Sequence, residues 1–120
     1  MSRGPREIFN EFAQGLQEVQ TTNKAQVEAF MKLNAAAYKT DVMDLKTKEL
    51  ISVAIGAYNR CEYCIVYHVY KALEAGATRE EIMEAAMVAV AFGAGPSMAY
   101  SVTLLKQSID EFEKDFLAKA

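Results

Sequence analysis

Both cysteines and the only histidine of this 120-residue chain lie close together, at Cys61, Cys64 and His68. On a helix, at roughly 100° per residue, these three side chains fall within about 60° of one another and share one face. A Cys-x-x-Cys pair at a helix start can close to a disulfide and reopen, because the first turn stabilises a thiolate and the spacing brings the sulfurs together. His68 lies where an imidazole can take the Cys64 proton directly or through a water. The stretch predicts thiol redox chemistry.

The residues before the first cysteine resemble the start of a helix. Asn59 is a suitable N-cap, and Glu62, three residues later, can complete a capping box. We therefore expect a helix from Arg60, with Cys61 in its first turn. There the unpaired N–H groups and the positive end of the helix dipole favour a thiolate.

Glu49 is an unusual residue for its surroundings. Asp44 can cap a helix from Leu45 to about Tyr58, and residues 49–58 are apolar on nearly all sides, as in a buried helix. An ionised carboxylate is costly in such a setting unless another group pairs with it. We expect His68 to be that group, so that Glu49, His68 and Cys64 form a proton relay.

The same residues admit other interpretations. The cysteines also suit a pair of small buried apolar side chains, and a single histidine on an inner face is often a hydrogen-bonded core residue. A disulfide between Cys61 and Cys64 closes too short a loop to stabilise a fold by itself. These cysteines with His68 and Glu49 make four possible zinc ligands, but three of them on one helix fit a tetrahedral site poorly. We therefore predict no metal and no cofactor.

The elements that must position these residues are all predicted to be helices. No strand-like alternation and no convincing repeat is present, so we expect an all-α, single-domain bundle of about six helices over residues 1–120. The helices are expected to begin at Pro5, after the cap Asn23, at Leu45, at Arg60, after the cap Thr78 and at Pro96. The first five are expected to end near Thr22, Lys39, Tyr58, Gly76 and Gly93.

Composition limits the classes of partner. The chain is 52% hydrophobic and 24% charged, which excludes a disordered chain and suggests self-association. With a formal net charge of −3 and scattered basic residues, no nucleic-acid partner is expected. The first residues lack the apolar run of a signal peptide, and we expect no apolar stretch of the ~20 uncharged residues that cross a membrane. We expect a cytoplasmic protein without a membrane partner.

The combined pattern resembles a known family. Glu49, eleven intervening residues, Cys61-x-x-Cys64, His68 and Gly76 are similar to the AhpD-like (alkylhydroperoxidase) branch of the carboxymuconolactone decarboxylase superfamily, over about residues 45–92. The resemblance implies an all-α fold, assembly into homotrimers or homohexamers, and thiol-dependent reduction of organic hydroperoxides or protein disulfides. It implies that Glu49 and His68 form the proton relay and the two cysteines the redox pair. Tyr63 departs from this pattern, because peroxidases of that branch carry a second histidine between the cysteines.

The leading expectation is a peroxiredoxin-type peroxidase or thiol-disulfide oxidoreductase. The Cys64 thiolate attacks a small hydroperoxide, Cys61 condenses with the resulting sulfenic acid, and an external dithiol reductant reopens the disulfide. One alternative is a non-catalytic oligomeric module that binds an apolar ligand. Another is a carboxymuconolactone decarboxylase-type lyase with His68 as acid or base, which would not require the cysteines.

Overall fold

The computed structural model describes residues 3–117, and its regular elements there are all helices. The prediction of an all-helical fold with about six helices is confirmed. The elements are α1 (Pro5–Thr22), α2 (Lys24–Tyr38), α3 (Leu45–Asn59), α4 (Glu62–Glu74), α5 (Arg79–Tyr100), the π-helical segment η1 (Ser101–Leu105) and α6 (Lys106–Leu117).

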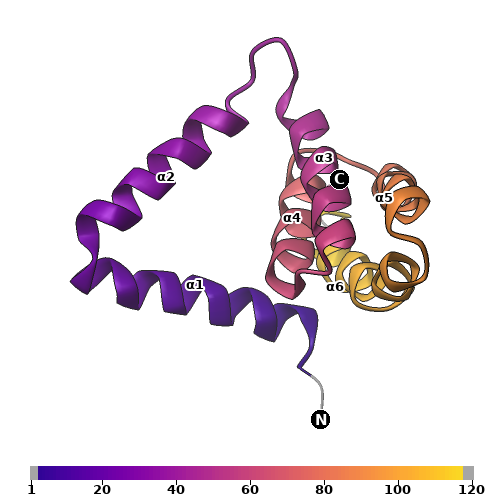
Figure 1. The fold of residues 1–120 in the computed structure, drawn as a ribbon, viewed down its shortest axis with the longest axis horizontal. Coiled ribbons are helices and arrows are strands. Elements are labelled where there is room, and N and C mark those ends of the chain that lie inside the picture. Colours follow the sequence, from indigo (N-terminus) through magenta and orange to yellow (C-terminus); the bar gives the residue numbers. More distant parts are fainter. Residues whose placement is uncertain (1–2, 118–120) are drawn as a thin grey trace.

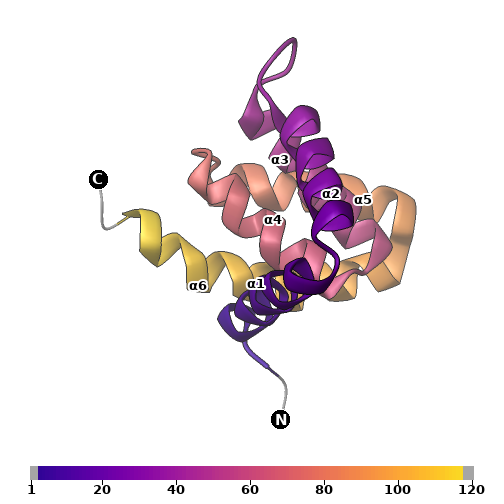
Figure 2. The same cartoon turned by 90° about the vertical axis from the view of Figure 1, so that its left-hand side faces the viewer.

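Helices α3, α4, α5 and α6 form the body of the molecule, and α1 and α2 form an arm (Figure 1). Helix α1 packs on α4 and α6, whereas α2 extends from the end of α1 and returns to the body through the loop before α3. The view from the side shows α1 beneath α4 and near the start of α6 (Figure 2). The arm therefore lies beside the two helices that carry Glu49 and the cysteines.

The core is built around α4, because this helix has neighbours on several sides. Its buried residues include Ile65, Val66 and Val69, all fully inaccessible to solvent. They pack in one apolar cluster with Val53 of α3 and Phe112 of α6. The remaining side of α4 carries Cys64 and His68, so burial of the apolar stripe fixes the direction of the reactive stripe.

Two predicted caps and one predicted stop are confirmed. The Asp44 carboxylate accepts a hydrogen bond from the Thr47 N–H at 2.8 Å. The expected cap Thr78 forms a capping box with Glu81: the Thr78 N–H donates to the Glu81 carboxylate at 2.9 Å, and the Glu81 N–H donates to the Thr78 hydroxyl at 3.1 Å. Gly76 follows α4 with a φ of +96°, a conformation that favours glycine.

The predicted start of the cysteine helix is wrong by two residues. Asn59 is the last residue of α3, and Arg60 adopts the left-handed conformation with a φ of 54°. The Arg60 N–H then donates to the Ala57 carbonyl at 3.3 Å, which reverses the chain. Cys61, with extended backbone, is the N-cap of α4, and the helix begins at Glu62. Cys61 still lies at the positive end of the helix dipole.

The predicted break after Gly93 is confirmed. The range given for α5 joins two helices across a kink at Ala94, whose φ of 55° and ψ of −138° lie outside the helical region. A proline is tolerated at position 96 because the kink two residues earlier interrupts the helix, so no helical hydrogen bond from the backbone nitrogen of residue 96 is required. The chain then enters α6 through η1, so the last predicted helix corresponds to the second part of α5, η1 and α6 together.

The prediction that the chain has no uncharged apolar stretch long enough to cross a membrane is wrong. The chain has no charged residue between Glu84 and Lys106. Among the described residues, one helical run, Arg79–Leu117, is long and apolar enough to cross a membrane by length and composition, and 22% of its apolar window is buried. Core helices of soluble proteins pass the same test. This run bends at Ala94 and contributes Leu105 to the core, so length and composition alone do not place it in a bilayer.

Candidate functional site

Glu49 and His68 are in direct contact across α3 and α4. The His68 Nδ1 atom lies 2.7 Å from the Glu49 Oε1 atom, and their side chains are only 19% and 4% exposed. A buried carboxylate requires a hydrogen-bond donor, so the arrangement favours the tautomer with the hydrogen on Nδ1. The Nε2 atom is then able to accept a proton. The structure thus brings together the two residues predicted to form the relay.

Two tyrosine rings hold the imidazole in place. Tyr38, at the end of α2, stacks on the His68 ring at a centroid distance of 5.6 Å and an interplanar angle of 19°. Tyr67 meets the same ring edge-on at 5.1 Å and 88°. The Ser52 hydroxyl donates to the Lys48 carbonyl at 2.9 Å, which leaves its oxygen to accept from the Tyr38 hydroxyl. Tyr38 therefore connects the arm to both His68 and α3.

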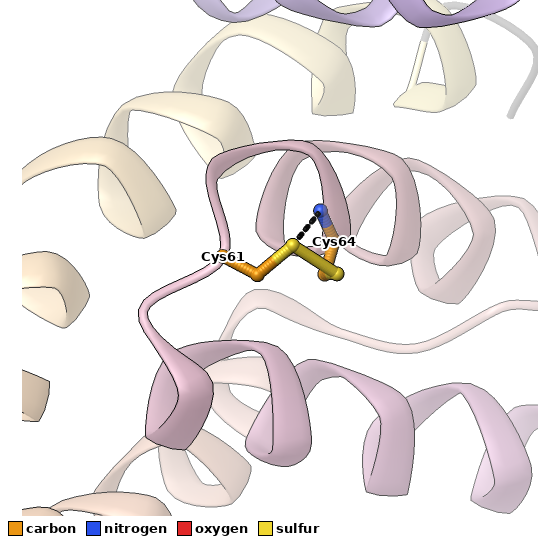
Figure 3. The surroundings of a disulfide bond; sticks show 2 residues. All are labelled: Cys61 and Cys64. Carbon is orange, nitrogen blue, oxygen red and sulfur yellow. Dashed lines mark hydrogen bonds between the residues drawn. A yellow bond between two sulfur atoms is a disulfide. The ribbon is translucent and has the colours of Figure 1, made fainter.

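The two cysteines are joined by a disulfide at the start of α4 (Figure 3). Their Cα atoms are 5.2 Å apart, and the Cys64 N–H donates to the Cys61 sulfur at 3.2 Å. Gly56 of α3 lies directly behind this turn. A Cβ atom at Gly56 would lie 3.2 Å from the Cys64 Cβ, so only glycine fits here without displacement of a neighbour. The pair that the sequence predicts to be redox-active can therefore form its disulfide in this fold.

The contact between the relay and the cysteines is not direct. Within residues 3–117 no hydrogen bond joins His68 to either sulfur atom, although His68 and Cys64 line one cavity. A water or a substrate oxygen is needed to carry a proton between them. The same residues contain no group of three or more His, Cys, Asp and Glu side chains arranged to hold a metal ion.

The cavity beside Cys64 has a volume of about 700 Å³. Helices α1, α2, α3 and α4 all contribute to it, and Glu49, Cys64 and His68 lie along one side. The arm supplies apolar walls, which include Phe9 and Phe12 of α1. A volume in this range is typical of small-molecule sites. The reactive side chains therefore face a space large enough for an organic substrate.

Tyr63, the residue between the cysteines, is engaged in a polar cluster. Its hydroxyl donates to Glu11 of α1, which also accepts from Arg3 at 2.7 Å. The hydrogen bond from Tyr63, followed by the one from Arg3, lowers the pKa of Glu11. Arg3 also donates to Glu62 at 2.6 Å, so Glu62 pairs with Arg3, whereas a bond to Asn59 was predicted. The cluster ties α1 to the first turn of α4.

The sequence of this chain is similar to a known protein family over most of its length. Residues 26–107 match the Carboxymuconolactone decarboxylase family. Uncharacterised protein 4 in the cox locus of Paracoccus denitrificans is 39% identical over 74 residues, which cover 62% of this chain and 67% of that protein. Alkyl hydroperoxide reductase AhpD of Corynebacterium aurimucosum is 42% identical over 65 residues, which cover 54% of this chain and 36% of that protein.

Solved structures agree with this placement. A carboxymuconolactone decarboxylase family protein from Legionella pneumophila, crystallised in its apo form, is 32% identical with a TM-score of 0.86, covering 91% of this chain and 96% of its own. A protein of the same family from Thermotoga maritima, described as a candidate for involvement in an antioxidative response, is 32% identical with a TM-score of 0.73. That similarity covers 90% of this chain and 94% of the Thermotoga chain.

Proposed function

Because the chain belongs to the carboxymuconolactone decarboxylase family, we propose that it is a thiol-dependent peroxidase or disulfide reductase of the AhpD-like type. The observation that carries the proposal is the Cys61–Cys64 disulfide on the same helix as His68, which Glu49 holds by a hydrogen bond. Similarity to the Corynebacterium AhpD, and to the Thermotoga protein with its suggested antioxidative role, supports the same activity.

The first step uses the reduced cysteine pair. His68 Nε2 accepts the Cys64 proton through a bridging oxygen, and Glu49 stabilises the imidazolium that forms. The Cys64 thiolate then attacks the terminal peroxide oxygen, and the O–O bond breaks. Cys64 becomes a sulfenic acid, while the alkoxide takes the proton from His68 and leaves as an alcohol. Two electrons pass from the sulfur to the peroxide.

The second step closes the disulfide seen in the structure. The Cys61 sulfur attacks the Cys64 sulfenic acid, and the hydroxyl leaves as water with the Cys61 proton. An external dithiol then opens the disulfide by two thiol-disulfide exchanges and becomes oxidised itself. When the substrate is a protein disulfide, the same cysteines donate the two electrons by exchange. The N-terminus of α4 stabilises the thiolate that each exchange releases.

The positions of the two cysteines support one order of attack. Cys64 lines the cavity together with His68, so a peroxide there reaches its sulfur beside the proton carrier. Cys61 is the N-cap, its sulfur accepts the Cys64 N–H, and it is not among the residues that line the cavity. This placement supports Cys64 as the attacking cysteine and Cys61 as the resolving one.

The reaction is tested by adding cumene hydroperoxide to the reduced protein and measuring free thiols. We expect two thiols lost per chain in the wild type, a dimedone-reactive sulfenic acid on Cys64 in Cys61→Ser, and no reaction in Cys64→Ser. The proposal is contradicted if both protein thiols stay reduced with cumene hydroperoxide and also with oxidised glutathione, as measured by mass spectrometry of the alkylated protein.

A lyase is the second candidate, because the family includes decarboxylases by name and the Glu49–His68 pair is able to move a proton without a sulfur. A lactone decarboxylase activity that survives in a Cys61→Ser/Cys64→Ser double variant identifies this alternative.

We also propose that the protein is a cytoplasmic homotrimer or homohexamer and that it requires no nucleic-acid or membrane partner.

A further inference from the structure

The cavity at the proposed site is lined by a cationic side chain that the fold does not use. Lys39 is the C-cap residue of α2 and lines the cavity. Within residues 3–117 its ammonium group makes no hydrogen bond or ion pair. A lysine at this position often caps the last carbonyls of its helix. Here Lys48 does so, donating to the carbonyls of Ala37 and Lys39 at 2.9 and 2.6 Å.

The other charges along the cavity are compensated. Glu49 accepts from His68 at 2.7 Å. Lys71, which also lines the cavity, donates to Glu74 at 2.8 Å. Lys39 is therefore the uncompensated charge among the lining residues, in a chain whose formal net charge is −3. An anionic group that enters the cavity gains a charge-assisted hydrogen bond there without breaking an existing ion pair.

Most of the remaining surface of the cavity is apolar. Phe12 and Leu16 of α1 face it from one side, and Phe30 and Met31 of α2 from another. Phe30 and Met31 are 49% and 46% exposed, so their apolar surface is uncovered in the free chain. Covering such surface with an apolar chain contributes roughly 25 cal/mol per Å². The walls thus favour a long hydrocarbon or aromatic group.

We propose that this cavity binds amphipathic carboxylates, with the apolar chain along the walls from α1 and α2 and the carboxylate at the Lys39 ammonium. Binding of the carboxylate does not depend on the proposed function, but the identification of the substrates as hydroperoxides rests on it. The preferred substrates are then hydroperoxides of long-chain carboxylic acids, with the peroxide group at Cys64. Their reduction follows the two steps above and yields the hydroxy acid and water.

Binding to the disulfide form tests the inference without any turnover. We expect calorimetry to show that decanoate binds about fivefold more tightly than 1-decanol, since a partly exposed ion pair contributes up to about 1 kcal/mol. Lys39→Met retains an apolar stem but removes the charge, and it should reduce decanoate affinity to that of decanol. Lys32→Met, an exposed lysine of α2 that does not line the cavity, is the matched control and should retain the preference.

Equal affinities for decanoate and decanol in the wild type overturn the inference. So does a lack of binding by both compounds, the result expected if a second copy of the chain fills the cavity, or a preference that Lys39→Met retains. Because the assay requires no peroxide, loss of the proposed peroxidase activity leaves this result standing. Conversely, peroxidase activity toward cumene hydroperoxide, combined with no preference for decanoate, preserves the function and removes only the substrate class.

Discussion

At the scale of single residues, the proposed chemistry depends on how His68 is held. Glu49 fixes Nδ1 of the ring, Tyr38 covers one face, and Tyr67 touches the ring edge-on. A ring fixed in this way keeps Nε2 directed toward one place, which general acid–base catalysis requires. In the proposed mechanism, each of these contacts contributes to reactivity as well as to packing.

The stacking of Tyr38 on His68 predicts a difference between two substitutions. Tyr38→Phe keeps the ring and loses the hydroxyl bond to Ser52, so the pH profile of Cys64 alkylation in the reduced protein should change little. Tyr38→Leu removes the ring, and alkylation at neutral pH should slow by about 2- to 10-fold, the size of an aromatic contact of 0.5–1.5 kcal/mol. Tyr58→Leu, an exposed tyrosine of α3, is the control. A Tyr38→Leu profile identical to wild type contradicts this role.

The sequence identifies some of these residues and not others. Glu49 is conspicuous because a carboxylate in an apolar helix requires a partner, and the one histidine supplies it. Tyr38, Ser52 and Lys39 carry no comparable signal. Their contacts join α2 to other helices through the fold, and neither periodicity nor capping rules describe which helices become neighbours.

At the scale of elements, the turn between α3 and α4 shows where local rules are insufficient. Glu62, three residues after Asn59, favours Asn59 as the N-cap by sequence. The structure instead ends α3 at Asn59 and caps α4 with Cys61. The close approach of Gly56 to Cys64 depends on this tight reversal, and it is a tertiary contact that no local signal contains.

Gly56→Ala therefore tests the packing of α3 on α4. The added Cβ would lie 3.2 Å from the Cys64 Cβ, so we expect destabilisation by about 1–3 kcal/mol in urea unfolding. Gly15→Ala is the control, because nothing lies within 4 Å of its Cβ position in α1. That change should stabilise the protein by about 0.5–1 kcal/mol through helix propensity. Similar effects of the two substitutions contradict the close approach.

The Asp44 cap of α3 predicts a pH dependence of stability. Hydrogen bonds from Thr47 lower the pKa of Asp44 in the folded state. A lowered folded pKa gives stability that is present above the unfolded value, ~3.9, and is lost as pH falls through the folded value. Asp44→Asn keeps a cap acceptor but does not titrate.

Thermal unfolding of the two proteins measures this effect. The melting temperature of the wild type should exceed that of Asp44→Asn at neutral pH, and the difference should shrink as pH falls below about 4. A difference that is constant with pH contradicts a charged cap.

At the scale of the whole molecule, many large apolar side chains are exposed on the surface. Ile51 and Ile55 of α3 are exposed, as are Val88 and Phe92 of α5, at 60% and 81% for the latter two. The sequence predicted α3 to be buried on nearly all sides, and its composition predicted self-association. Exposed apolar surface of this kind often marks an interface between proteins.

Self-association is accordingly the expected use of this surface. Sedimentation velocity should show a species several times larger than the 13.3 kDa chain, consistent with a trimer or hexamer. Val88→Glu/Phe92→Glu should reduce its size, because a buried unpaired carboxylate is costly at an interface. Gln17→Glu, on the exposed side of α1, adds a charge elsewhere and should have no effect. A wild-type monomer at micromolar concentration contradicts the assembly.

The overall fold was more predictable than the arrangement of its parts. Helical periodicity and the caps Asp44 and Thr78 placed most helix ends, because these signals are local. The arm of α1 and α2 was not predictable, since the cavity it forms depends on long-range packing.

The central claim, that Glu49 acts through His68 on the reactivity of Cys64, is tested most directly by alkylation of the reduced protein as a function of pH. Peptide mass spectrometry follows Cys64 in wild type, in Glu49→Gln, and in the control Glu11→Gln, whose carboxylate bonds Tyr63 and Arg3. We expect Glu49→Gln to slow Cys64 alkylation at neutral pH by about tenfold or more and to move the profile to higher pH, while Glu11→Gln matches the wild type. Superimposable profiles for wild type and Glu49→Gln would contradict it.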